Sequence, residues 1–518
     1  MDTVTLLLLI LVTLYIGAWV FIRRNPAAER RGIVPYGPTI MVKTQVGKVL
    51  VDKLAAPRRF WRAYATLSKV IVFGLMIFIT GLLLWQMTLI SNIPRESALG
   101  PQYILGIPGL NPIIPIGYGI IALIVCIFIH EAAHGILARV NDMDIKTTGL
   151  LFLVFPIGAF VEPDEGQLSN AGKRERSDVY AVGAATNFIL AVILAVVLAF
   201  SLLGGVQASY ADNPVIVTVT GNSPADRAGM GMGMVIIDMD GTPIENINDF
   251  FTFNGTDPGT VMNVTIVQKD GERIISLVSG VLIESAFSGQ PAYEAGIRAG
   301  MLVEKVEGVT IRSLADFNAV MDDTVPGQLI TVSTLSYDPE TDAWNGAPTN
   351  HTLTLGEGPL PKGYMGVTTS MSGMGVNTPD NVLGFLKEPY RNSETPGDYV
   401  MDTLRFLALP FLGLSPMPSE LTWLFESNGI LQGDAFWILV NLVYWIFWMN
   451  LMIGLTNALP AVPLDGGFLF MDAMDSIVKK VNRKADEEQR RRTVGSITSW
   501  MALLILFMII WQFVGPRL

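Results

Sequence analysis

The chain has 518 residues, enough for several domains, and half of them are hydrophobic while only 16% are charged. Its mean hydropathy of +0.44 is typical of a membrane protein. The formal net charge of -11 argues against nucleic acid as a partner, and the single cysteine, Cys126, excludes an intramolecular disulfide.

Long apolar runs predict about six membrane-spanning helices. The first run lacks the basic start of a signal peptide, so we interpret it as a span. In chain order the predicted spans are residues 4–22, 68–90, 118–140, 179–203, 436–458 and 496–514.

The distribution of charge predicts how these spans are oriented. Lys and Arg gather in segments 23–62, 139–176 and 470–495, and short loops rich in these residues stay in the cytoplasm. The block 205–434 holds 28 acidic and 10 basic side chains, a balance of -18 against about +7 for the remaining chain. We therefore expect an acidic insertion outside the cytoplasm, between basic membrane segments.

The third apolar run contains the sequence His130-Glu131-Ala132-Ala133-His134. On a helix the two histidines lie one turn apart on the same face, so both imidazoles can reach one metal ion. Glu131 is then placed beside the ion as a general base. Ionisable groups at membrane depth are costly, which makes these three residues functional candidates.

Two apolar segments are less regular than the spans. Residues 149–161 are too short to cross a bilayer and contain Pro156, so we expect a re-entrant hairpin or a short strand pair. Residues 398–414 mix charged and apolar side chains around Pro410, which favours an interfacial amphipathic helix over a seventh span.

The acidic block contains an internal repeat. Residues 223–230 match residues 290–297 with an offset of 67, and the same offset relates Asp240-Gly241 to Glu307-Gly308. The pattern resembles the PDZ fold of proteases over about 210–280 and 281–357. The resemblance implies either recognition of extended peptides, often free C-termini, or a filter that excludes bulky substrates.

A catalytic zinc site needs a third protein ligand, and the candidates at membrane depth are carboxylates. They are Glu162, Asp164, Glu165 and Asp465. Asp465 follows the fifth span directly, between two prolines and two glycines that can break the helix and aim a carboxylate inward. The alternative is a loop aspartate that caps the next helix. His351, at the end of the second repeat, is predicted to be a surface histidine.

Residues 130–134 and 457–467 together resemble the two signatures of the site-2 protease family of intramembrane zinc metalloproteases (peptidase M50 type). Residues 183–187 and 158–165 resemble further elements of that family. The resemblance implies zinc bound by His130, His134 and Asp465, with Glu131 as the base. It also implies that Asn457 hydrogen-bonds the substrate or developing oxyanion, and that Asn187 positions the core helices.

The predicted function is intramembrane cleavage of transmembrane segments in single-span membrane proteins, within the plasma membrane. The alternatives are an inactive membrane scaffold with structural zinc and a metal transporter.

The predicted fold class is a polytopic α-helical membrane protein with an inserted pair of extracytoplasmic α+β PDZ-like domains. The predicted regions are 1–117, the N-terminal spans with a basic loop; 118–204, the first segment of the catalytic membrane core; 205–280 and 281–358, the PDZ-like domains; 359–433, a linker with the interfacial helix; 434–470, the second segment of the catalytic membrane core; and 471–518, the basic loop and last span.

Overall fold

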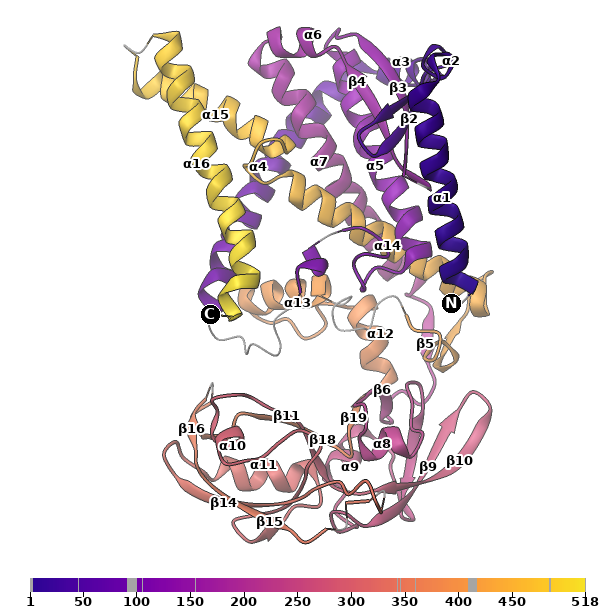
Figure 1. The fold of residues 1–518 in the computed structure, drawn as a ribbon, viewed down its shortest axis with the longest axis vertical. Helices are drawn as coiled ribbons and strands as arrows, with labels where there is room; N and C mark the ends of the chain where they lie inside the picture. The colour runs from indigo at the N-terminus through magenta and orange to yellow at the C-terminus, as the bar shows by residue number, and fades with distance from the viewer. Residues whose placement is uncertain are drawn as a thin grey trace. The chain divides into compact units, whose positions relative to one another are not determined.

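The computed structural model divides into two compact units (Figure 1). Unit 1 is Met1–Val197 with Asn441–Leu518, and unit 2 is Leu198–Val440. The residues that the structure describes are 3–44, 46–90, 100–104, 106–153, 155–341, 343–344, 346–358, 360–408, 417–483 and 486–517.

Unit 1 is mainly helical. Five helices in the described residues are long and apolar enough to cross a membrane. They are α4 (Arg58–Leu89), α5 (Ile116–Val140), α7 (Lys173–Val196) with its π-helical continuation η4 (Val197–Leu202), α14 (Gly433–Asn457) and α16 (Glu487–Val514) with η7 (Gly515–Arg517). These helices match five of the predicted spans. The first predicted span coincides with α1 (Thr3–Arg24), which is not one of these five helices. The total of six spans therefore stays a prediction.

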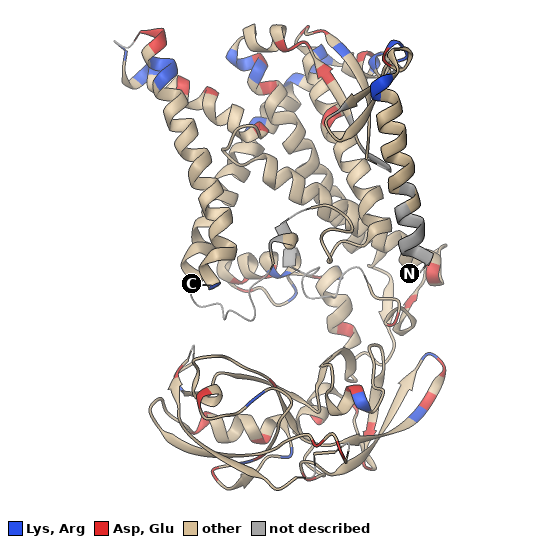
Figure 2. Ribbon diagram, in the orientation of Figure 1, with Lys and Arg blue, Asp and Glu red and all other residues tan. Residues whose placement is uncertain are grey.

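The shorter helices of unit 1 are α2 (Pro26–Arg30), α3 (Val46–Ala55), η3 (Pro101–Ile104), α6 (Glu165–Asn170) and α15 (Asp465–Val481). Lys and Arg residues gather at one end of this unit, where α2, α3 and α6 lie and where α15 ends (Figures 1 and 2). The three basic segments of the sequence thus meet at a single end, as segments facing the same side of a membrane must.

Unit 1 also contains a four-stranded antiparallel sheet in the order β1-β2-β3-β4. Its strands are β1 (Ile33–Tyr36), β2 (Thr39–Thr44), β3 (Ile145–Leu153) and β4 (Phe155–Pro163). The strand pair expected at 149–161 is therefore present as β3 and β4, and β2 extends it from a distant region of the chain. β4 lies at the end of the strand order, so no strand of the described residues pairs with its outer edge. It also packs against α5.

Unit 2 is rich in strands. Ten of them form one ordered sheet, β10-β9-β7-β6-β19-β18-β11-β12-β14-β15, to which β8 and β13 add. The strands are β5 (Val206–Ala208), β6 (Val215–Val219), β7 (Val235–Met239), β8 (Thr242–Pro243), β9 (Val261–Gln268), β10 (Gly271–Val278), β11 (Val281–Ala286), β12 (Leu302–Val306), β13 (Val309–Thr310), β14 (Leu329–Leu335), β15 (Thr349–Thr354), β16 (Gly356–Glu357), β17 (Gly363–Tyr364), β18 (Val367–Met371), β19 (Met374–Asn377) and β20 (Phe425–Ser427).

The sequence repeat appears in unit 2 as two similar hydrophobic cores. Ile216 and Phe250 lie in the first core, and Ile283 and Phe317, 67 residues later, lie in the second. The helices of unit 2 repeat as well, in the order α8, α9 and then α10, α11. They are α8 (Pro224–Arg227), α9 (Ile247–Thr252), α10 (Pro291–Glu294) and α11 (Leu314–Asp322), followed by α12 (Pro379–Lys387), α13 (Pro396–Ala408) and η6 (Thr422–Leu424). Their assignment as PDZ domains stays a prediction.

The segment 359–433, predicted as a linker, also contributes to the sheet. Its β18 pairs with β11 of the second repeat, and its β19 pairs with β6 of the first. Ser372 and Gly373 connect the two strands with φ of +51° and +87°, the conformation of a tight two-residue hairpin turn. This hairpin thus adds one strand beside each repeat, and the predicted ends of the two domains at 280 and 358 stay predictions. The predicted interfacial helix corresponds to α13 as far as residue 408, and 409–416 lie outside the described residues.

The prediction for His351 is wrong. Only 8% of its surface is exposed, in β15. Its Nδ1 atom lies 2.9 Å from the Ala295 carbonyl oxygen, and its Nε2 atom lies 3.0 Å from Thr334 Oγ1. Because both ring nitrogens have partners, these hydrogen bonds offset the cost of burying the imidazole in the second repeat.

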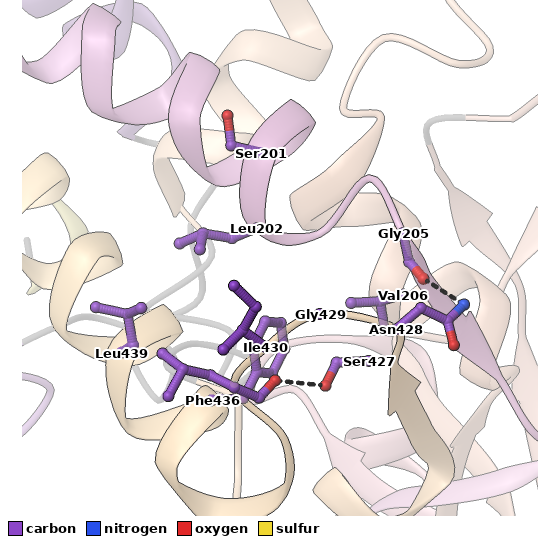
Figure 3. Close-up of a pocket in the computed structure, with 11 residues that line it drawn as sticks. Ser201, Leu202, Gly205, Val206, Ser427, Asn428, Gly429, Ile430, Phe436 and Leu439 are labelled. Carbon is purple, nitrogen blue, oxygen red and sulfur yellow. Dashed lines mark hydrogen bonds between the residues drawn. The ribbon is translucent and has the colours of Figure 1, made fainter.

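A cavity of about 370 Å³ in unit 2 separates η4 and β5 from the loop before α14 (Figure 3). Ser427 Oγ donates to the Leu431 carbonyl within the loop, and Asn428 Nδ2 donates to the carbonyl of Gly205, the residue before β5. Ile430 between them is fully exposed. An exposed isoleucine directly before an apolar helix is expected at the lipid interface.

Candidate metal centre

Helix α5 brings His130 and His134 together. Residues four apart on a helix lie on one face, and here the two Nε2 atoms are 3.1 Å apart. His134 Nδ1 lies 2.7 Å from the Val179 carbonyl oxygen on α7. That carbonyl can only accept a hydrogen bond, so Nδ1 carries the proton and Nε2 keeps its lone pair free for a metal ion.

Asp465 is the first residue of α15, after the loop that ends α14. Its Oδ2 atom is 3.2 Å from Nε2 of His130 and 3.2 Å from Nε2 of His134. The next two residues are glycines, which lets the start of α15 lie against the loop at residues 458–461. A Cβ on Gly466 would lie 2.3 Å from the Ala458 carbonyl oxygen, and one on Gly467 would lie 2.4 Å from the backbone of Ala461.

The three donor atoms fit a divalent metal ion. They form a nearly equilateral triangle with sides of 3.1–3.2 Å. A tetrahedral zinc ion with ligands at about 2.0 Å holds them about 3.3 Å apart. Asp465 Oδ2 is buried, and its capacity for hydrogen bonds is otherwise unused. No fourth His, Cys, Asp or Glu of the described chain joins this group, so three ligands would leave one coordination position for water or substrate.

The other carboxylates considered as third ligands are engaged elsewhere. Glu162 lies 4.0 Å from the Lys43 ammonium. Asp164 caps α6, and the hydrogen bond from the Gln167 amide holds the pKa of Asp164 below its usual range. Glu165 lies exposed in the first turn of α6. Asp465 is therefore the one carboxylate of the four that the structure brings to the histidine pair.

Glu131 follows His130 on α5 and faces β4. Its Oε2 atom lies 3.4 Å from the backbone nitrogen of Val161, whose N–H points toward it. Val161 pairs with Thr148 of β3 in the ladder. The Val161 N–H that reaches Glu131 lies on the edge of β4 that has no strand partner. The candidate base and an unpaired strand edge thus lie side by side next to the donor triangle.

Gly183 on α7 makes room for the two imidazoles. A Cβ at this position would lie 2.3 Å from His134 Nε2 and 2.8 Å from His130 Nε2. Since those nitrogens are two of the three donor atoms, a side chain here would enter the space where the ion binds. The sequence singled out this glycine only through a family resemblance, which did not assign it this contact.

We expect Gly183→Ala to lower the affinity for metal about 10–100-fold, as changes in the surroundings of metal ligands do. Alanine favours a helix over glycine, so loss of folding is not the expected cause. Gly81→Ala on α4 is the matched control, since nothing lies within 4 Å of a Cβ there. Metal titration of both purified variants measures the effect. Equal affinity in the two variants contradicts the steric role of Gly183.

Asn187 and Asn457 differ in their surroundings. Asn187 is fully buried on α7, and its Nδ2 donates to Cys126 Sγ on α5 at 3.1 Å. This contact links α7 to α5, the helix that carries both histidines. The positioning role of Asn187 stays a prediction. Asn457 is the last residue of α14, directly before the Ala458 carbonyl that Gly466 approaches. Its contact with substrate stays a prediction.

Helix α15, which begins with Asp465, is anchored by ion pairs to its neighbours. Sequence patterns did not indicate these pairs. Arg176 Nη2 of α7 lies 2.5 Å from Asp472 Oδ1, and Arg490 Nε of α16 lies 2.7 Å from Asp475 Oδ1. Burial acts to raise the pKa of Asp475, but hydrogen bonds from Lys173 and Arg490 outweigh it and hold that pKa below its usual range. The Arg176–Asp472 pair joins residues about 300 positions apart, which is why local patterns gave no sign of it.

Two histidines and a glutamate on an apolar helix, with an aspartate from a separate helix brought to the histidine pair, are the set of residues that defines the class of membrane metallopeptidases. Within that class the chain belongs to Peptidase family M50, whose family model matches residues 118–504. The resemblance to the site-2 protease family is thereby confirmed.

Curated relatives are distant and match only over a portion of their length. An uncharacterised protein of Methanocaldococcus jannaschii is 26% identical over 243 residues, which are 46% of this chain and 62% of the relative. A protein of Agrobacterium fabrum, provisionally named a zinc metalloprotease, is 25% identical over 30% of this chain and 50% of the relative. One of Clostridium perfringens with the same description is 28% identical over 37% and 55%. The chain thus spans about half to three fifths of these relatives.

Proposed function

We propose that this protein is an intramembrane zinc metalloendopeptidase that cleaves transmembrane segments of single-span membrane proteins, and so acts in regulated intramembrane proteolysis. The observation that carries the proposal is the triangle of His130, His134 and Asp465 donor atoms with sides of 3.1–3.2 Å. Both histidines lie on a helix long and apolar enough to cross a membrane, and Asp465 begins the helix that follows another one. Glu131 beside this triangle supplies the base that hydrolysis needs.

Each step of hydrolysis has a candidate group in this chain. A zinc ion held by the three ligands would supply Lewis-acid chemistry, polarising the scissile carbonyl and lowering the pKa of a water molecule. Glu131 takes the proton from the attacking water and then delivers it to the leaving amine. We assign to the Asn457 amide a hydrogen bond to the substrate or to its developing oxyanion, as the family resemblance implies.

A substrate helix in lipid has all its backbone groups paired, so it must unwind before it can be cut. The unpaired edge of β4 supports a way to stabilise the unwound segment, as an added strand with new backbone hydrogen bonds. Because Val161 on this edge faces Glu131, a strand added there would lie beside the base. Residues 149–161, predicted from the sequence to form a re-entrant hairpin or a short strand pair, would thus also bind the substrate.

The geometry favours an enzyme over the two alternatives. A structural zinc site fills four positions with protein ligands, whereas three are present in the described chain. A metal transporter of the usual type has two related halves with paired discontinuous helices. The repeat of this chain lies instead in the sheet-rich unit 2.

Location and partners also belong to the proposal. The basic end of unit 1 supports a cytoplasmic side at that end, in a plasma membrane. The acidic composition of 205–434 supports a position outside the cytoplasm for unit 2. Its repeats would act there as PDZ-like domains that bind peptide C-termini or exclude bulky substrates.

The test uses the full chain in liposomes with a single-span membrane protein as substrate. We expect mass spectrometry to locate the cut inside the apolar span. A zinc chelator should stop cleavage, and added Zn²⁺ should restore it. Cleavage that persists after the bound metal has been removed would contradict the proposal, as would cuts confined to segments outside the span.

A further inference from the structure

Away from the metal centre, we propose that the C-terminal end of α15 binds the phosphate group of an anionic phospholipid. A cavity of about 620 Å³ lies there, which we call the basic pocket. It is lined by Lys173, Ser476, Lys479, Lys480 and Arg483. All five residues belong to unit 1, and four of them lie on or just after α15, which ends where Lys and Arg residues gather (Figure 2). The lining carries four cations and no carboxylate.

Three of those cations are available to a ligand. Lys479, Lys480 and Arg483 are exposed, and none has an ion-pair partner among the described residues. Lys173 contacts Asp475 and donates to Ser476 Oγ at 3.3 Å. Phosphate oxygens can accept hydrogen bonds from several ammonium and guanidinium groups at once, so the pocket matches an anion of this kind.

A neighbouring cavity differs from the basic pocket in that its arginines have ion-pair partners. It holds about 580 Å³ and shares Lys173 with the basic pocket. Its arginines are all paired, Arg176 with Asp472, Arg490 with Asp475 and Arg491 with Glu487. Paired charges offer little attraction to an added anion, so the excess of positive charge is specific to the basic pocket.

The apolar residues beside the basic pocket indicate a lipid as the source of the phosphate. Ile477 and Val481 lie one turn apart on α15, and 49% and 82% of their surfaces are exposed. A helix with exposed aliphatic residues next to lysines places the former at the acyl boundary and the latter at the headgroups. Acyl chains of a bound phospholipid would cover these two side chains, which a free phosphate ion could not do.

Bound lipid would also stabilise the helix that holds a metal ligand. Asp465 is the first residue of α15 and Lys480 is in its last turn, so the ion pairs of Asp472 and Asp475 lie between the two sites. An anion at the far end adds a further anchor to the same helix. This consequence rests on the proposed function, whereas lipid binding does not.

Native mass spectrometry of the full chain in neutral detergent tests the proposal with phosphatidylglycerol and phosphatidylcholine. We expect preference for the anionic lipid, and about 100-fold weaker binding in the variant Lys479→Gln/Lys480→Gln/Arg483→Gln, since each charge contributes about fivefold. Arg491→Gln/Arg492→Gln is the matched control, because both arginines are exposed on α16 and paired with Glu487 and Glu488. Thermal unfolding checks that both variants fold.

Two further measurements separate the sources of phosphate. Ile477→Ser/Val481→Ser should weaken phosphatidylglycerol binding although every charge remains. Inorganic phosphate should compete only at much higher concentration than the lipid. Equal loss of binding in the control, equal binding of phosphatidylcholine, or equal competition by inorganic phosphate overturns the lipid assignment. None of these readouts depends on proteolysis, so they stand apart from the test of the proposed function.

Discussion

Glu131→Gln is expected to abolish cleavage and leave the bound metal in place. The amide keeps the size of the side chain and can still accept the hydrogen bond that the Val161 N–H directs at Glu131. It cannot take a proton from water, however, and a positioned general acid–base typically contributes 10²–10⁴-fold to the rate. Elemental analysis of the purified variant measures the metal, and cleavage in liposomes measures the activity.

The control for this experiment is Glu165→Gln, which changes an exposed carboxylate in the first turn of α6. It should retain both metal and activity. A membrane scaffold with structural zinc predicts no functional change in either variant. Full activity of Glu131→Gln would therefore exclude the assigned base and favour that scaffold.

The same variant can identify substrates. If cleavage stops while the centre stays assembled, a single-span membrane protein should remain bound to the unpaired edge of β4. Capture with Glu131→Gln, compared with the unchanged protein, is expected to enrich such partners. Substitution of the β4 edge by Val161→Pro removes one backbone N–H and should reduce that enrichment.

Sequence patterns were sufficient to single out the three donor groups that lie together in the structure, because few residue types at few spacings can bind one metal ion. Two histidines four residues apart must share a helical face. The choice of ligands was narrow as well, since the chain has three histidines and few carboxylates near apolar segments. Two prolines and two glycines around Asp465 indicated a broken helix, and the structure uses both glycines to bring α15 close to Ala461 and Ala458.

Long-range pairing was beyond those patterns. β2 pairs with β3 across about a hundred residues, and β18 and β19 return to strands of two separate repeats. No local periodicity encodes such partners, although Ser372-Gly373 is a recognisable turn pair. His351 was misjudged for a related reason, because its burial depends on Ala295 and Thr334, which lie on other elements.

Asp465→Asn is expected to lower metal affinity by more than the 10–100-fold that changes in outer contacts cost, and to reduce cleavage with it. The carboxylate is one of three ligands, and its Oδ2 atom lies 3.2 Å from each histidine donor. An asparagine keeps the shape but removes the charge that offsets the ion, and it can turn its amide nitrogen toward the site. Metal titration and cleavage assays measure the two effects.

Glu162→Gln is the control, because it removes the charge of a carboxylate that is not a predicted metal ligand in the structure. Glu162 was a candidate third ligand, yet it lies beside Lys43 instead of the histidine pair. It should therefore bind metal as the unchanged protein does. If Asp465→Asn also kept its metal and its turnover, the third ligand would have to come from another residue. The triangle of donor atoms would then not be the metal site. Loss of both in Asp465→Asn alone ties proteolysis to a centre assembled from α5 and α15.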